Sequence, residues 1–207
     1  MNKKVGMYSS IVTFLAVFAF AACMALGLLF KNDTIGHFLS YLSSIFIAFG
    51  FISMVCSYLT FTKNEYKSLG LIALAFSIMY GIMVIAVYFT QLTTVRISQL
   101  SEELIELLDF QKSGLFFNYD LLGYGFMAIS TFFIGLKLET NNKHERLLKY
   151  LLCIHGIFAI SCFIMPMMGI FNKNMAGKDI IGIIVLEFWC IYFMPICILS
   201  HKYFKNR

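Results

Sequence analysis

The chain has 207 residues, of which 60% are hydrophobic and 13% are charged, whereas an ordinary soluble domain is about 25% charged. Its mean hydropathy of +0.82 excludes a soluble globular domain, a disordered chain and a disulfide-stapled secreted module. No polar stretch is long enough to fold as a separate soluble catalytic domain. We therefore expect an all-α polytopic membrane helix bundle, a single domain over residues 1–207 with the lipid bilayer as its main partner.

Six apolar segments are long enough to cross the bilayer as helices. A crossing needs about 20 mostly apolar residues, and the second and third segments are long enough to require some tilt. In chain order the segments are Ser9–Phe30, His37–Phe61, Leu69–Thr93, Leu115–Leu138, Tyr150–Phe171 and Ile180–Ser200.

The first segment shares some features with a cleaved leader. Lys3 and Lys4 precede its apolar run, and Phe20–Cys23 resembles a lipoprotein cleavage box in which phenylalanine replaces the usual leucine. The apolar run continues unbroken to Phe30, which favours a retained spanning helix over a processed leader.

The basic residues predict the orientation in the membrane. With six crossings, both termini and the loops after the second and fourth segments share one side. That side carries eleven lysines and arginines, and the other side carries five, namely Lys31, Arg96, Lys112, Lys173 and Lys178. Basic residues stay cytoplasmic, so we expect a cell-membrane protein with both termini in the cytoplasm.

The same basic rim explains the net charge of +5. Cytoplasmic lysines and arginines can contact anionic headgroups, so the charge requires no nucleic-acid partner. Lysine outnumbers arginine, which favours a bacterial source with an AT-rich genome.

Between the third and fourth segments, Ser98–Phe110 is predicted to form a short amphipathic helix. Ser101 can cap it, and Glu102 and Glu103 fall in its first turn. The leucines at helical spacing are Leu100, Leu104, Leu107 and Leu108. We interpret this segment as a surface helix on the outer membrane face; the alternative is a lid over a cavity.

Three ionisable residues lie inside the predicted spans, and such groups usually face protein or water because lipid penalises them. At a rise of 1.5 Å per residue, Asp120 and Glu187 lie about 8 Å and about 11 Å below the outer rim. His155 lies nearer the inner rim, and no lysine or arginine is deep enough to pair with either acid.

Each of these residues belongs to a polar helical stripe, and convergence of the stripes would create an outward-opening polar centre. The candidate ligand-binding residues are Asp120, Glu187, Arg96, Gln91, Tyr88, Tyr124 and His155. Structural alternatives exist. Asp120 could accept a hydrogen bond from a helix amino terminus, His155 could bond a backbone carbonyl, and Tyr88 could belong to the aromatic belt.

Catalytic and metal motifs are missing from the sequence. The six cysteines lie in apolar runs without CxxC spacing, where they behave as small hydrophobes, so we expect no disulfides. There is no HExxH, GxSxG or phosphate-cradling glycine loop. We therefore expect no enzyme activity, no metal and no cofactor. Pro166 and Pro195 predict kinks in the fifth and sixth spans.

Two segments resemble a group of small six-span bacterial membrane proteins of uncharacterised function: YFTQLTTVR at Tyr88–Arg96 and DFQKSGLFFNYDLLGYGFMAIST at Asp109–Thr131. The resemblance covers a minor part of the chain and implies no activity, ligand or partner. The residues that it places in a signature region are Gln91, Arg96, Asp109, Asp120 and Gly123. Within that region Arg96 is expected to pair with Asp109 or to reach toward Asp120, supplying the missing counter-charge.

Three functions are consistent with these features. The first is a transporter-like or sensor-like protein that binds a small-molecule ligand or an ion in an outward-facing polar pocket. The second is an accessory subunit whose spans pack against a membrane-protein partner or against further copies of the chain. The third is an intramembrane lipid-modifying enzyme with Asp120, His155 or Glu187 as acid–base groups.

Overall fold

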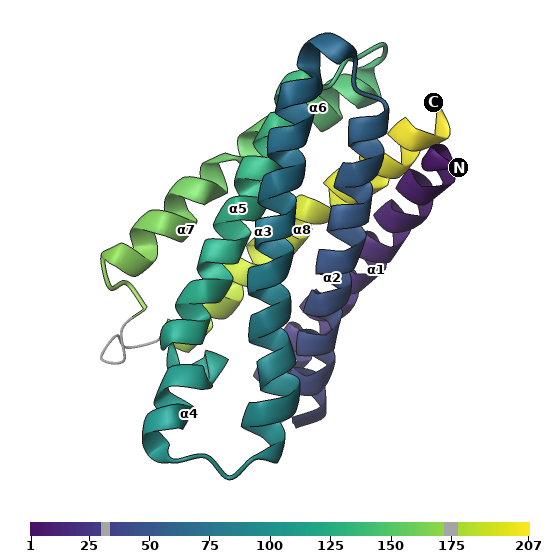
Figure 1. Cartoon of the computed structure of the whole chain (residues 1–207). Helices are drawn as coiled ribbons and strands as arrows, with labels where there is room; N and C mark the ends of the chain where they lie inside the picture. The colour runs from purple at the N-terminus through teal and green to yellow at the C-terminus, as the bar shows by residue number, and fades with distance from the viewer. Residues whose placement is uncertain (30–33, 172–177) are drawn as a thin grey trace.

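A computed structural model describes the backbone of residues 1–29, 34–171 and 178–207, and the side chains of residues 1–26, 35–171 and 181–207. Every regular element in these ranges is helical, which confirms the predicted all-α fold (Figure 1). Of the basic residues used to predict the orientation, Lys31, Lys173 and Lys178 have side chains outside the described residues.

Among the described residues, six stretches of helix are long and apolar enough to cross a membrane. They are α1 (Asn2–Leu29), α2 (Thr34–Thr60), α3 (Lys67–Thr90), α5 (Leu115–Lys137), the pair α6 (Lys143–His155) and α7 (Ile157–Met167), and α8 (Lys178–Lys205). The six-span prediction is therefore confirmed. Five of the six spans begin earlier than predicted, α1 and α6 by seven residues, because polar residues such as Lys3 continue a helix once it has formed.

The fifth span differs most from its prediction, because two helices replace the single one expected over Tyr150–Phe171. The chain turns at Gly156, whose amide bonds Cys153 O at 3.1 Å. The break is thus not at Pro166, which lies in the last turns of α7, while α8 is continuous through Pro195. A Cβ at Gly156 would lie 2.9 Å from Cβ of Phe132, so glycine permits the close approach to α5 here.

The helices pack as a ring. Close neighbours follow in the order α1, α2, α3 and α5, then α6 with α7, and α8 returns from α6 to α1. Both termini lie at the end of the bundle where α6 begins, and the short helix α4 (Glu102–Leu108) lies at the opposite end (Figure 1). We call these the terminal end and the α4 end.

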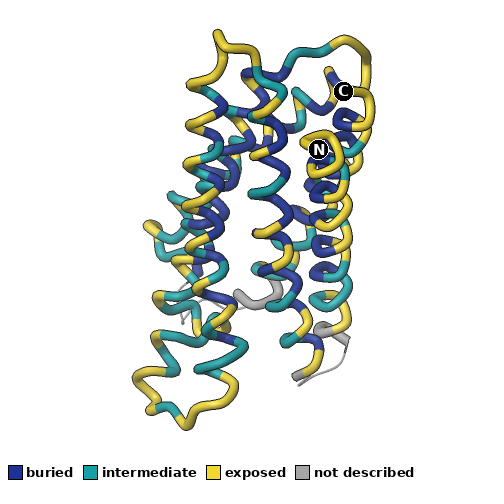
Figure 2. The backbone as a smooth tube through the Cα atoms, turned by 45° about the vertical axis from the view of Figure 1, so that its right-hand side comes forward, coloured by how far each residue is buried: buried dark blue, intermediate teal, exposed yellow. Residues whose placement is uncertain are grey.

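Large aromatic side chains fill the centre of the ring. The ring of Phe51 lies 5.5 Å from that of Tyr80 and 6.1 Å from that of Phe193, joining α2, α3 and α8. Outward-facing residues such as Ile82 and Ile191 are apolar and exposed. Figure 2 shows buried positions on the inner sides of the helices and exposed positions on the outer sides, as expected for a bundle solvated by lipid.

At the α4 end the chain leaves α3 through a π-helix, η2 (Gln91–Val95), and returns through α4 and the 3₁₀ turn η3 (Phe110–Lys112). The predicted amphipathic helix is confirmed but is shorter than Ser98–Phe110. Ser101 caps it as expected, because its hydroxyl oxygen accepts from Leu104 N at 3.4 Å.

Gln91 fixes this returning segment to the bundle. Its Nε2 donates to Leu108 O at 2.8 Å, and its Oε1 accepts from Phe110 N at 3.0 Å. The Gln91 side chain is buried. Its amide group therefore supplies the hydrogen bonds that water would otherwise make to backbone groups without helical partners in α4 and η3.

Candidate functional site

Asp120 occupies the second turn of α5 and faces the bundle centre with 2% of its surface exposed. Its Oδ1 has no hydrogen-bond partner among the described residues. The structural alternative of a helix amino-terminal bond is therefore not formed at this oxygen, because Asp120 lies a full turn beyond the first free amide groups of α5.

Three tyrosines surround this carboxyl group. Tyr80, Tyr88 and Tyr124 are all buried, and each interacts electrostatically with Asp120. The rings of Tyr80 and Tyr124 lie 5.6 Å apart. None of the three hydroxyl oxygens makes a hydrogen bond of good geometry with the described residues, although Tyr88 lies close enough to interact with Asp120, and Tyr124 with Tyr80, as hydrogen-bonding pairs. Four buried polar oxygens thus converge without a well-formed hydrogen bond, which is rare in a folded protein.

A cavity of about 60 Å³ opens beside this cluster. Asp120 and Tyr124 of α5 line it together with Trp189 of α8 and residues of α7. One water molecule needs about 10–15 Å³ on a comparable measure. The cavity is therefore large enough for a small polar group next to the carboxylate.

Two larger cavities lie beyond it at the α4 end, and we call them together the vestibule. Their volumes are about 370 Å³ and about 190 Å³, and His37, Tyr41 and Gln111 line both. Phe171 and Leu186 line the larger vestibule cavity as well as the cavity beside Asp120. These two side chains are consequently the partition between the vestibule and Asp120.

Aromatic rings make up much of the vestibule lining. Tyr41 of α2 lies 5.5 Å from the ring of Tyr88 and 6.2 Å from that of Phe110. His37 stacks on Tyr41 at 6.2 Å, and its Nδ1 lies 3.3 Å from Nε2 of Gln111. The vestibule thus presents ring faces and a few polar groups, the usual lining of a small-molecule site.

The predicted ion pairs of Arg96 are not formed in the described part of the chain. Its guanidinium lies 4.9 Å from the ring centre of Phe38, while Asp109 Oδ1 instead caps η3 by accepting from Gln111 N at 3.0 Å. Arg96 lines the smaller vestibule cavity. It therefore does not neutralise Asp120.

His155 belongs to a separate network and is fully buried. Its Nε2 accepts from Nε1 of Trp189 at 3.0 Å, and its Nδ1 lies 2.7 Å from Oγ1 of Thr131. Since Nε2 accepts, the neutral ring carries its proton on Nδ1 and donates to Thr131, which itself donates to Ala128 O at 2.8 Å. The bond predicted from His155 to a backbone carbonyl is thus relayed through a threonine.

Glu187 also lies apart from Asp120. It is partly buried and its Oε1 has no hydrogen-bond partner among the described residues, yet it lines neither the vestibule nor the cavity beside Asp120. Of the seven candidates, the structure brings together Asp120, Tyr88 and Tyr124. Sequence reasoning did not single out Tyr41, which lies one turn after His37 on the same helical face, nor Trp189, the only tryptophan in the chain.

The described residues contain neither a cluster of metal ligands nor a disulfide. Within the described side chains, no three His, Cys, Asp or Glu residues gather as metal ligands. None of the six cysteines forms a disulfide in the structure. In comparisons of the chain with protein-family models, with curated proteins and with solved structures, no match was found.

Proposed function

We propose that this chain is a transporter-like or sensor-like membrane protein that binds a small cation at Asp120, reached from the vestibule. The observation that carries the proposal is the group of unpartnered oxygens on Asp120, Tyr80, Tyr88 and Tyr124. Leaving such groups unbonded costs about 1–3 kcal/mol each. A bound hydrogen-bond donor would recover that free energy.

The chemistry of the cluster favours a protonated amine. A carboxylate and phenol oxygens accept hydrogen bonds, and aromatic faces attract an ammonium group. The cavity of about 60 Å³ beside Asp120 fits the cationic group. The vestibule cavity of about 370 Å³ fits an apolar remainder against Phe110 and Phe117.

The side of access follows from the basic residues of the sequence. Because positive charge concentrates at the terminal end, we place that end in the cytoplasm and the vestibule outside. Ligand would then pass from the vestibule to Asp120 by displacement of Phe171 or Leu186, the two side chains between them.

Thermal unfolding of the purified protein in mild detergent tests the proposal, with sodium, ammonium and benzylamine as probes and benzyl alcohol as the neutral control. We expect a cation to raise the unfolding midpoint and benzyl alcohol to leave it unchanged. Asp120→Asn should weaken cation binding about 10–100-fold, the effect of losing a charge-assisted hydrogen bond.

Two further variants make the test specific. Glu103→Gln removes an exposed acid of α4 that lines neither vestibule cavity, and this variant should bind as the wild type does. Gly182→Phe fills the vestibule, because an added Cβ at Gly182 meets nothing within 4 Å, and it should block benzylamine more than ammonium. The proposal fails if Asp120→Asn responds to every cation as the wild type does. Uptake of benzylamine into proteoliposomes then separates transport from sensing.

A further inference from the structure

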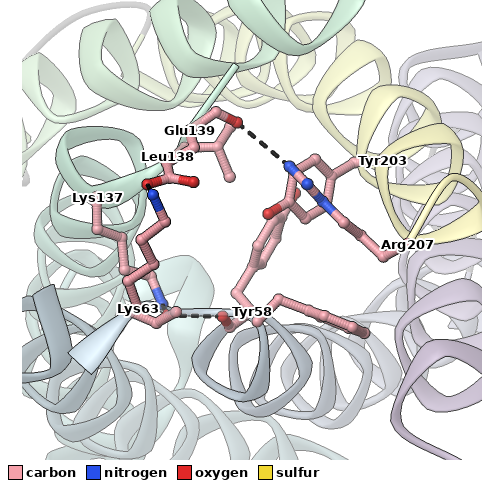
Figure 3. Close-up of a pocket in the computed structure, with 9 residues that line it drawn as sticks. Tyr58, Lys63, Lys137, Leu138, Glu139, Tyr203 and Arg207 are labelled. Carbon is pink, nitrogen blue, oxygen red and sulfur yellow. Dashed lines mark hydrogen bonds and ion pairs between the residues drawn. The ribbon is translucent and has the colours of Figure 1, made fainter. Parts of the chain in front are cut away.

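A separate pocket lies at the terminal end of the bundle, remote from the vestibule (Figure 3). Its volume is about 30 Å³, and its lining includes three basic side chains, Lys63, Lys137 and Arg207, together with Glu139 and the rings of Tyr58 and Tyr203. In Figure 3 the lysines face Arg207 and Tyr203 across the pocket.

Lys137 is the most buried of the three cations, with 6% of its surface exposed. Its Nζ donates to Thr62 Oγ1, and no carboxylate of the described residues lies within 4 Å of it. A Cβ at Gly70 would lie 3.1 Å from Nζ, so this glycine leaves room for the ammonium group. A buried ammonium without an opposite charge is unfavourable.

The two nearby carboxylates already have partners. Glu139 pairs with Lys63 at 2.6 Å, and this hydrogen bond raises the pKa of Lys63. Glu145 accepts from Asn141 N at 2.8 Å and lies 3.6 Å from Arg207. Three cations therefore face two carboxylates, and the uncompensated positive charge falls on Lys137.

We propose that this pocket binds an oxyanion of the phosphate class, with Lys137 as its counter-ion and Lys63 and Arg207 beside its mouth. The volume of about 30 Å³ admits one compact group and excludes a nucleotide. Cytoplasmic basic pockets of membrane proteins attract anionic headgroups. The phosphate can thus belong to a lipid or be free in solution, and the test below separates the two sources.

The Tyr203 ring packs against Arg207 at the pocket mouth. The guanidinium of Arg207 lies 4.6 Å from its centre, and one guanidinium nitrogen donates to Glu139 O at 3.4 Å. Tyr58 is engaged elsewhere, since its hydroxyl donates to Ser200 Oγ at 2.7 Å. Arg207 is therefore held at the pocket mouth, while the lysines have donor hydrogens left for an anion.

The experiment compares wild type with Lys137→Gln and with Lys205→Gln, an exposed lysine at the same end. In detergent, inorganic phosphate is titrated against sodium chloride of equal ionic strength, and the unfolding midpoint is followed. In nanodiscs, phosphatidylglycerol is compared with phosphatidylcholine, and co-purifying lipid is counted by native mass spectrometry.

Free phosphate is identified as the ligand if phosphate stabilises the wild type and its affinity falls at least tenfold in Lys137→Gln but not in Lys205→Gln. Retention of phosphatidylglycerol that depends on Lys137, with no response to phosphate, identifies a lipid headgroup. Lys137→Arg should keep the binding, which guards against misfolding of the glutamine variant. Equal responses of wild type and Lys137→Gln in both arms overturn the proposal.

Discussion

Asp120 and Glu187 are both carboxylic acids within membrane-spanning helices, yet their surroundings differ. Asp120 faces three buried tyrosines and a cavity, whereas Glu187 lines none of the cavities described above. A carboxylate among unbonded hydroxyls can hold a donor from several directions. Depth in the membrane therefore matters less for the candidate site than the residues that each acid faces.

Gln91 shows how a polar residue at the edge of a site can have a structural role. Replacing it with alanine would leave Leu108 O and Phe110 N without their present partners. We expect Gln91→Ala to cost about 1–3 kcal/mol and to loosen α4 selectively. Hydrogen exchange over residues 101–113 should quicken several-fold while α8 is unchanged. Uniform exchange across the chain would contradict this role.

At the scale of elements, the contact between α5 and α6 depends on small residues. A Cβ at Gly135 would lie 2.6 Å from Sγ of Cys153 and 2.9 Å from its backbone nitrogen. Gly135→Ala should therefore destabilise the protein by about 1–3 kcal/mol through overpacking.

Gly182→Ala is the matched control for this prediction. An added Cβ at Gly182 meets no atom within 4 Å, so the unfolding midpoint should stay the same or rise slightly. Chemical or thermal denaturation of both variants measures the difference. If the two alanine variants lose the same stability, close helix contact does not explain Gly135.

Hydropathy predicted the elements well where one span is one helix, as for Leu115–Leu138 against α5. It missed the break at Gly156 because averaging over about 20 residues hides a single turn. Helical periodicity placed Asp120 and Tyr124 on one face correctly. It could not place Gln91 against backbone 17 and 19 residues further along the chain, because such contacts depend on the path of η2 and α4.

Lys137 illustrates a different limit of sequence reasoning. As the last residue of α5, it entered the sequence argument only as one of eleven basic residues on the predicted cytoplasmic side. A positive charge at a helix carboxyl terminus needs no further explanation. Its burial against Thr62 and Gly70 comes from the packing of α3 and of the loop between α2 and α3 around it, which no local pattern reveals.

For the whole molecule, the structure places both termini at one end and α4 at the other, while the basic residues predict which end is inside. We expect a reporter that is active only in the cytoplasm to be active when it is fused after Arg207. A single cysteine replacing the exposed Ser98, in a variant without native cysteines, should react with an impermeant maleimide added to intact cells. The opposite labelling pattern would reverse the assignment of the vestibule to the outside.

Helix α8 runs the length of the bundle and contributes to both proposed sites. Leu186 and Trp189 line the cavity beside Asp120, and Tyr203 lines the pocket of Lys137. If binding at one end displaces α8, the same displacement reaches the other end, and the occupancies of the two sites are then thermodynamically linked. Whatever factor phosphate imposes on amine affinity, the amine must impose on phosphate affinity. The amine concentration on one side of the membrane would then affect phosphate binding on the other side.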